Sequence, residues 1–185
     1  MTGATVANAK VDGAQNLIIN STGTSRFVAE VGSVTAIGNG TGASLTLGAS
    51  SGATTFDSTL RTATGITQAG TAGLLTFRDD VNILSNQTAT TLNANVNLDG
   101  MTLTSAGAVT FGDSSSDQVT LSGGPVTLAV TGVTVANAKV DGAQNLIINS
   151  TGTSQFVAAV GSATAIGDGT GASLTLGASS GATTF

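Results

Sequence analysis

The stretch VDGAQNLIINSTGT, from Val11 to Thr24, occurs a second time without change at residues 140–153. It belongs to a longer repeat, because residues 2–56 recur at 131–185, a fixed 129 positions later, with 50 of 55 positions identical. The five exchanges are Ala4/Val133, Arg26/Gln155, Glu30/Ala159, Val34/Ala163 and Asn39/Asp168. A period of this kind indicates stacked units that contact their neighbours along one axis. We therefore expect residues 1–185 to be one continuous segment of a repetitive array, uncapped at both ends.

The composition favours strands over helices. Only 8% of the residues are charged, against roughly 25% in a typical globular domain. The chain contains 26 Gly, 32 Thr, one Pro and six Phe, with no Trp or Tyr. Thr and Val fit a pleated sheet, and Gly provides the corners between strands. These numbers predict an all-β protein with essentially no helix.

Charge and cysteine content exclude several classes of protein. The net charge is −5, and the five basic residues are spread along the chain, so the sequence does not favour nucleic-acid binding. Without cysteine, no disulfide forms. No run of 18 apolar residues is present, so we expect no membrane span. The first residues lack a basic and then apolar signal pattern, so a signal for export would have to lie elsewhere in a parent chain.

Short apolar segments alternate with turn-forming clusters. Most read apolar-Thr-apolar or apolar-Asn-apolar, which is the period of two of a strand with one buried face. These segments are 17–19, 27–28, 45–47, 74–77, 81–83, 96–98, 101–103, 109–111, 119–121 and 126–128. Between them, pairs such as Asp12-Gly13 and Asp99-Gly100 are strong corner signals.

Two β architectures are compatible with this pattern. An antiparallel sandwich joins its strands by hairpins, whereas a parallel solenoid winds two or three short strands into each coil. Strands of three to five residues and a scarcity of aromatic side chains favour the solenoid, or parallel β-helix. With about 18–22 residues per coil, one period would contain six or seven coils and advance the axis by roughly 30 Å, at about 4.8 Å per coil.

The repeated stretch also resembles a known family. Residues 11–24, followed by Phe27 and the segment 29–32, are similar to the "VDGAQNL-x-[VI]-N-[AS]-x-G-T" units of giant bacterial β-strand-repeat surface proteins, which resemble filamentous haemagglutinin. The segments 109–112 and 121–124 have the same style. The resemblance implies a right-handed parallel β-helix, export to the bacterial cell surface, and a role in adhesion, filaments or cell coats. It implies no catalytic residues, and this period differs from the shorter or less regular spacing of many relatives.

The densest charged cluster is Arg78-Asp79-Asp80. Paired carboxylates beside an arginine can act as general acid and base, and some β-helix enzymes that cut polysaccharides use acidic clusters. The alternative, which we favour, is a solvated corner after Phe77. The chain has no histidine or tyrosine and little aromatic surface for a sugar ring. We therefore predict no catalytic residue and no enzyme activity.

Two further groups of charged residues have alternative interpretations. Asp113 and Asp117 flank three serines and could contribute oxygens to a calcium ion, although a loop without metal fits better because no EF-hand or calcium-roll motif is present. We predict no other cofactor. Arg26 and Glu30 are both replaced in the second copy, as expected if they form a surface ion pair or if two independent surface changes occurred.

The sequence thus predicts a secreted structural protein, a stiff fibre, filament or adhesin stalk at the bacterial surface. Its expected partners are copies of itself, joined end to end or side by side, or further repeats of a longer chain. The alternative is an adhesive module that binds carbohydrate or a surface, with glycans as partners. A polysaccharide-cleaving β-helix enzyme is the third hypothesis.

Overall fold

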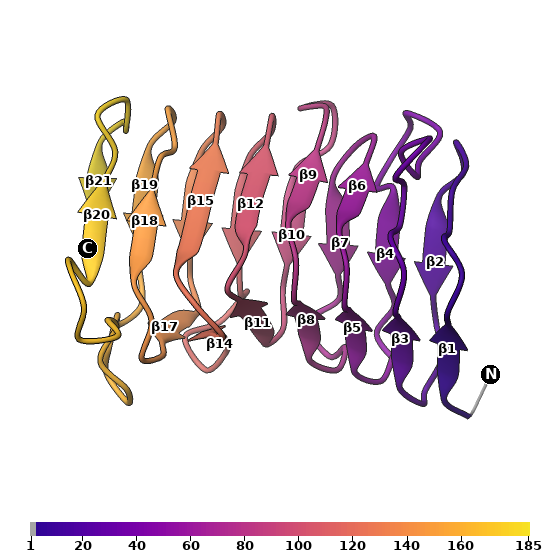
Figure 1. The fold of residues 1–185 in the computed structure, drawn as a ribbon, viewed down its shortest axis with the longest axis horizontal. Helices are drawn as coiled ribbons and strands as arrows, with labels where there is room; N and C mark the ends of the chain where they lie inside the picture. The colour runs from indigo at the N-terminus through magenta and orange to yellow at the C-terminus, as the bar shows by residue number, and fades with distance from the viewer. Residues whose placement is uncertain (1–2) are drawn as a thin grey trace.

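The computed structural model describes residues 3–185, which form a parallel β-solenoid of about seven turns. The turns lie side by side along the long axis of the molecule, with the two ends of the chain at opposite ends of the rod (Figure 1). No described residue lies in a helix, so this part of the chain has no helical membrane span. The predicted all-β parallel solenoid is confirmed.

Three sheets, which we call walls 1, 2 and 3 in the order in which the chain visits them, enclose the interior. Wall 1 contains β1 (Thr5–Ala7), β3 (Ser25–Phe27), β5 (Thr54–Phe56), β8 (Leu75–Phe77), β11 (Val96–Asp99), β14 (Gln118–Ser122) and β17 (Lys139–Asp141). Wall 2 contains β6 (Leu60–Thr62), β9 (Val81–Ile83), β12 (Thr102–Ser105), β15 (Val126–Val130), β18 (Leu146–Ile148) and β20 (Leu174–Leu176). Wall 3 contains β2 (Leu17–Ile19), β4 (Leu45–Leu47), β7 (Ile66–Gln68), β10 (Thr90–Leu92), β13 (Val109–Phe111), β16 (Thr134–Ala136), β19 (Ser154–Phe156) and β21 (Thr183–Thr184).

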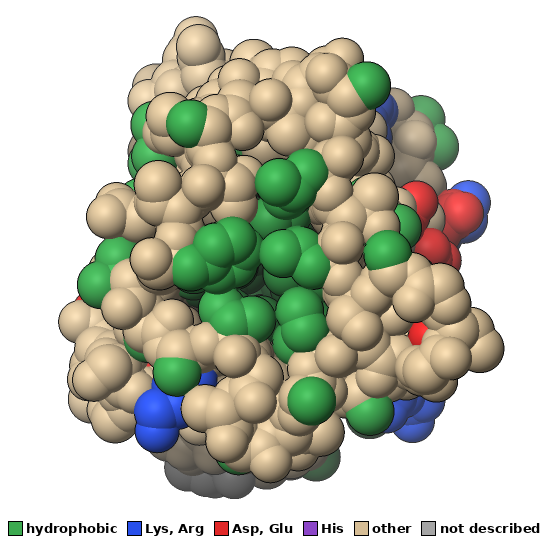
Figure 2. All heavy atoms as spheres, turned by 90° about the vertical axis from the view of Figure 1, so that its left-hand side faces the viewer, with side chains coloured by type: hydrophobic (Ala, Val, Ile, Leu, Met, Phe, Trp, Pro, Cys, Tyr) green, Lys and Arg blue, Asp and Glu red, His purple; other side chains and the backbone are tan. Residues whose placement is uncertain are grey.

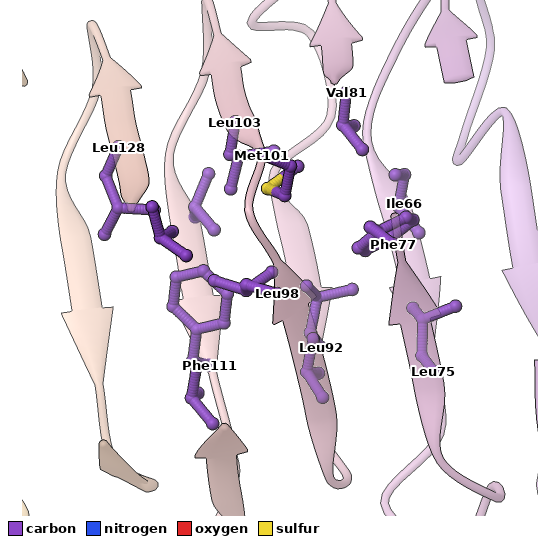
Figure 3. Packing of buried hydrophobic residues seen from close by; sticks show 14 of the residues in the cluster. Ile66, Leu75, Phe77, Val81, Leu92, Leu98, Met101, Leu103, Phe111 and Leu128 are labelled. Carbon is purple, nitrogen blue, oxygen red and sulfur yellow. The ribbon is translucent and has the colours of Figure 1, made fainter. Parts of the chain in front are cut away.

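Most three-residue strands point their first and third side chains inward; β17 is an exception, since Lys139 is exposed and its middle residue Val140 is buried. In β4, Leu45 and Leu47 are buried and Thr46 faces outward, as the period of two requires. Every strand pair is parallel, and Leu45 is in register with Ile66 of the next turn. Figure 3 shows Leu92, Leu98 and Phe111 pointing from different strands into the same interior. The result is one hydrophobic core that runs along the axis.

Several strands were not predicted because an inward position carries threonine. Thr54, Thr90 and Thr134 are each buried at the first position of β5, β10 and β16. A hydropathy pattern treats these residues as polar. The Thr54 hydroxyl donates to the Gly52 carbonyl at 3.4 Å and the Thr90 hydroxyl accepts from the Ile66 N–H at 3.2 Å, and the β-branched side chain suits a strand, so the stack accepts these residues inside.

The turns differ in length more than expected. Val11 is in register with Val31, and Val31 is itself in register with Leu60 on the following turn. The second of these turns is the longer by nine positions, and it contains the glycine-rich loop 32–44. From Thr5 on wall 1 to Thr134 on wall 3, one full period of the repeat covers five turns and two further walls. This count corrects the expected six or seven coils, because long loops use residues without advancing the winding.

Candidate functional site

The cluster Arg78-Asp79-Asp80 lies at a corner of the rod, directly after β8. The Arg78 Nη1 atom donates to Asp57 Oδ1 at 3.0 Å, and Arg78 Nε is 3.6 Å from Asp99 Oδ2. Asp79 Oδ1 accepts from the Asp80 backbone N–H at 2.8 Å, and Asp80 Oδ1 accepts from the Thr102 N–H at 2.7 Å. The two carboxylates therefore hold the backbone of the corner and of the next turn.

Two hollows of the described chain lie away from these carboxylates. One hollow lies inside the rod between residues such as Leu98, Phe111 and Val140. Another lies at the first turn, between residues such as Leu17, Ile19 and Phe27. Neither lining contains a charged side chain. Asp79 and Asp80 line neither hollow.

The most extensive charged feature is a charge ladder, formed by Arg26, Asp57, Arg78 and Asp99 on successive turns of wall 1. Arg26 Nε lies 2.5 Å from Asp57 Oδ2, and Asp57 also binds Arg78. The ladder ends at Asp99, whose Oδ1 accepts from the Ser122 hydroxyl at 2.9 Å. Because signs alternate from turn to turn, each charge lies between opposite charges or beside one.

Sequence reasoning missed Asp57. Its signal was the interval of 21 residues between Asp57 and Arg78, which recurs between Arg78 and Asp99. Each of these three residues follows an inward residue of a strand on wall 1. The interval equals the length of the turns that connect them. A search for charges at coil spacing would have found the ladder.

The hypothesis of an ion pair between Arg26 and Glu30 is wrong. Arg26 pairs with Asp57, and Glu30 pairs with Lys10, whose Nζ is 2.5 Å from Glu30 Oε2. Four residues along an extended chain cover about 13 Å, whereas the next turn is only about 4.8 Å away. Each charge therefore finds its partner on a neighbouring turn. The hydrogen bond and charge of Lys10 lower the pKa of Glu30, and Glu30 raises the pKa of Lys10.

Substitution of Asp57 by asparagine is expected to lower the free energy of unfolding by about 0.5–2 kcal/mol, since two ion pairs of about 0.2–1 kcal/mol each are lost. Because both arginines are about half exposed, the loss should shrink at high salt. Urea denaturation at low and high salt measures it. Asp79→Asn, which removes a carboxylate outside the ladder, is the control. Losses for Asp57→Asn that do not respond to salt would contradict the ladder.

The calcium candidates Asp113 and Asp117 lie in the corner after β13. Asp117 Oδ2 accepts the backbone N–H groups of Asp113 at 3.1 Å and Ser114 at 3.0 Å. Asp113 Oδ2 approaches Gly70 on another turn so closely that a Cβ at Gly70 would lie 2.4 Å away. Within residues 3–185, no three His, Cys, Asp or Glu side chains gather as metal ligands would. Asp117 therefore closes the turn, and the preference for a loop without metal over a calcium site stays a prediction.

The Asn39/Asp168 exchange places a titratable carboxyl group in the second copy, so part of the stability of that copy should depend on pH. The Thr170 hydroxyl and backbone N–H both donate to Asp168 Oδ1 at 2.7 Å, and these bonds lower the pKa of Asp168. A lowered pKa in the folded state adds stability above the ordinary pKa, and this stability is lost as the pH falls through the folded-state value.

Between roughly pH 5 and pH 2, the urea midpoint of the unchanged chain should therefore fall more than that of Asp168→Asn. The first copy supplies the reciprocal variant. Asn39 Oδ1 already accepts from the Thr41 N–H and hydroxyl, so Asn39→Asp should add a second acid-sensitive contribution. Parallel pH curves for all three chains would contradict this interpretation.

The outer face of wall 3 carries no charge along one continuous column of side chains. In register order, the column consists of Ile18, Thr46, Thr67, Thr91, Thr110, Val135 and Gln155. Four threonines on consecutive turns present stacked hydroxyl and methyl groups. This wall is suited to contact with a flat, uncharged surface.

The last turn exposes the apolar interior of the rod. Figure 2, which looks at the C-terminal end, shows hydrophobic side chains gathered at its centre. Leu176 is 51% exposed and Phe185 is 68% exposed, whereas their counterparts Leu47 and Phe56 are buried. At this end, β20 of wall 2 and β21 of wall 3 have no further strand beside them.

Comparisons with known proteins add no assignment: no family model, curated protein or solved structure matches the chain. The similarity to β-strand-repeat surface proteins therefore stands on residues 11–24 and their surroundings, while the solenoid itself is established by the structure.

Proposed function

We propose that this chain is a structural segment of an extracellular repeat protein, and that it forms part of a stiff fibre, filament or adhesin stalk on a bacterial surface. The observation that carries the proposal is the set of three parallel walls that continue from turn to turn around one core. Bending such a rod opens backbone hydrogen bonds on one wall and uncovers the core beneath it. The resemblance of residues 11–24 supports the location.

The surface of the rod supports assembly more than catalysis. Charges are few, and those of the charge ladder neutralise one another along wall 1. Wall 3 is uncharged over seven strands, which lets rods approach side by side without electrostatic repulsion. The apolar C-terminal end favours contact end to end.

Light scattering across a range of concentrations tests self-association, and two variants separate its modes. We expect the chain to form dimers and longer species, and Leu176→Asp to shift them toward monomers, because a charge would be buried at the end-to-end contact. Thr91→Asp, in the centre of wall 3, is the matched control and should leave end-to-end species intact. If only Thr91→Asp dissociates the species, the rods pack side by side. A strict monomer at high concentration would contradict self-association.

The location requires a separate experiment on intact cells that produce the parent protein. Labelling with an antibody raised against this segment, and its removal by external protease, are the expected results. Labelling only after the cells are broken would overturn the proposed surface location.

The threonine column on wall 3 favours a second candidate, a carbohydrate- or surface-binding module. Hydroxyl groups at a spacing of about 4.8 Å offer repeated donors and acceptors to a glycan. A glycan array is the direct test, with Thr67→Lys as the control that should abolish any binding at this wall. If no glycan on the array binds, the structural role is favoured.

A further inference from the structure

The two copies of the repeat occupy different walls of the solenoid. Strand β1 lies on wall 1, whereas β16, which has the same sequence, lies on wall 3. Likewise β2 lies on wall 3 and its counterpart β18 on wall 2. The pairs β3 and β19, β4 and β20, and β5 and β21 are displaced by one wall in the same sense.

The local structure of the repeat is nevertheless unchanged between the copies. Asp12 Oδ1 accepts from two backbone N–H groups of the next turn, at 2.9 and 3.3 Å. Asp141 Oδ1 accepts from the equivalent groups at 2.8 and 3.3 Å. The bridge between Val11 and Val31 recurs between Val140 and Val160. The second copy is thus the same structural unit, rotated by one wall about the axis.

The rotation follows from the winding, because one period passes five turns and two further walls, and the loop within the repeat adds residues without adding a wall. The turn from Val31 to Leu60 is longer by eight positions than the next turn, which runs from Leu60 to Val81. The second copy shows the same difference, since the turn from Ile148 to Leu176 is longer by eight positions than the turn that ends at Ile148. Eight positions equal about one third of an ordinary turn. These eight residues form part of the loop and do not advance the chain around the axis. One period of the repeat therefore ends one wall short of six full turns.

We infer that each period of this repeat turns by one wall, so that successive copies present loop 32–44 and its counterparts on successive edges of the rod. In Figure 1, loop 32–44 lies at the upper edge near β4, and its counterpart 161–173 lies at the lower edge near β17. In a tandem array with this period, three copies occupy all three edges, and a fourth returns to the first. A partner that binds the loop would meet it from every side of the rod. The inference rests on the winding alone and holds whatever the rod does.

Distances between spin labels on the full 185-residue chain test the rotation, since the chain has no cysteine of its own. Ile18→Cys and Gln155→Cys lie on the outer face of wall 3, six strands apart, which corresponds to about 29 Å along the axis. Arg26→Cys and Gln155→Cys mark equivalent residues of the two copies, on wall 1 and wall 3. Their separation along the axis is about 27 Å, but the two labels lie on different walls, so the full distance between them also includes a component across the rod.

We expect the Arg26/Gln155 distance to exceed the Ile18/Gln155 distance by several ångströms. If the period contained six full turns, both copies would share their walls and the order would reverse, with Arg26/Gln155 at about 29 Å. The reversed order, or equal distances, would overturn the inference. Circular dichroism checks that each labelled chain folds. If a labelled chain does not fold, Thr46→Cys replaces Ile18→Cys, and Thr55→Cys replaces Arg26→Cys. Each replacement is in register with the original residue on the same wall. Dilution of the doubly labelled chain with unlabelled chain suppresses distances between molecules, so self-association does not change the comparison.

Discussion

Substitution of Phe56 by alanine should lower the free energy of unfolding by about 3–5 kcal/mol, the usual cost of removing a buried phenylalanine. Phe56 is 1% exposed and lies between two other rings on wall 1. Its centroid is 4.8 Å from that of Phe27 and 5.8 Å from that of Phe77. The substitution leaves a cavity at the middle of this stack, and turns above and below hold the backbone in place, so the space cannot collapse.

The second copy provides a matched control for Phe56. Phe185 follows the same Gly-Ala-Thr-Thr sequence but is 68% exposed, and it stacks on Phe156 alone at 5.1 Å. Phe185→Ala should therefore cost no more than about 1.5 kcal/mol, the value of one aromatic pair. Urea denaturation of both variants measures the difference. Equal losses would show that Phe56 is not enclosed by neighbouring turns.

Substitution of Gly142 by alanine is expected to cost more than about 4 kcal/mol, at the upper end of single substitutions. Gly142 has φ of +136°, and a Cβ there would lie 2.1 Å from the Leu121 carbonyl oxygen of the preceding turn. Backbone cannot yield as a flexible side chain does. The substitution should therefore force the two turns apart and break the register between them.

Gly13 separates the backbone strain from the steric clash. It has the same φ of +136° and the same neighbours in sequence, but in the first turn nothing lies within 4 Å of the position that a Cβ would take. Gly13→Ala should thus cost only the strain, about 1–3 kcal/mol. Comparison of the two variants by urea denaturation, supported by hydrogen exchange of β14 and β17, measures the contribution of the stacked turn. Equal costs would contradict close packing of β14 against the corner at Gly142.

Much of the fold could be predicted from local patterns. The alternation in Leu45-Thr46-Leu47 determines which side chains face inward, and the glycine and asparagine corners limit strands to three to five residues. Where the pattern failed, as at Thr54 and Thr90, the cause was an inward threonine that only its neighbours in the stack make acceptable. The sequence identifies the charged residues but not their partners: it suggests Glu30 as one possible partner of Arg26, which binds Asp57 instead.

The sequence by itself determined that this chain forms short strands with one inward face, that glycines turn its corners, and that one unit is used twice, because these properties depend on neighbouring residues along the chain. Only the tertiary structure decided which residues meet across turns, such as Asp57 with Arg26 and Arg78, and on which wall each copy lies. The physical reason is that contacts between turns depend on the summed length of every loop before them. The long loop adds residues without adding a wall, and one period passes five turns and two further walls, so a nearly identical sequence lies on a different wall in the second copy.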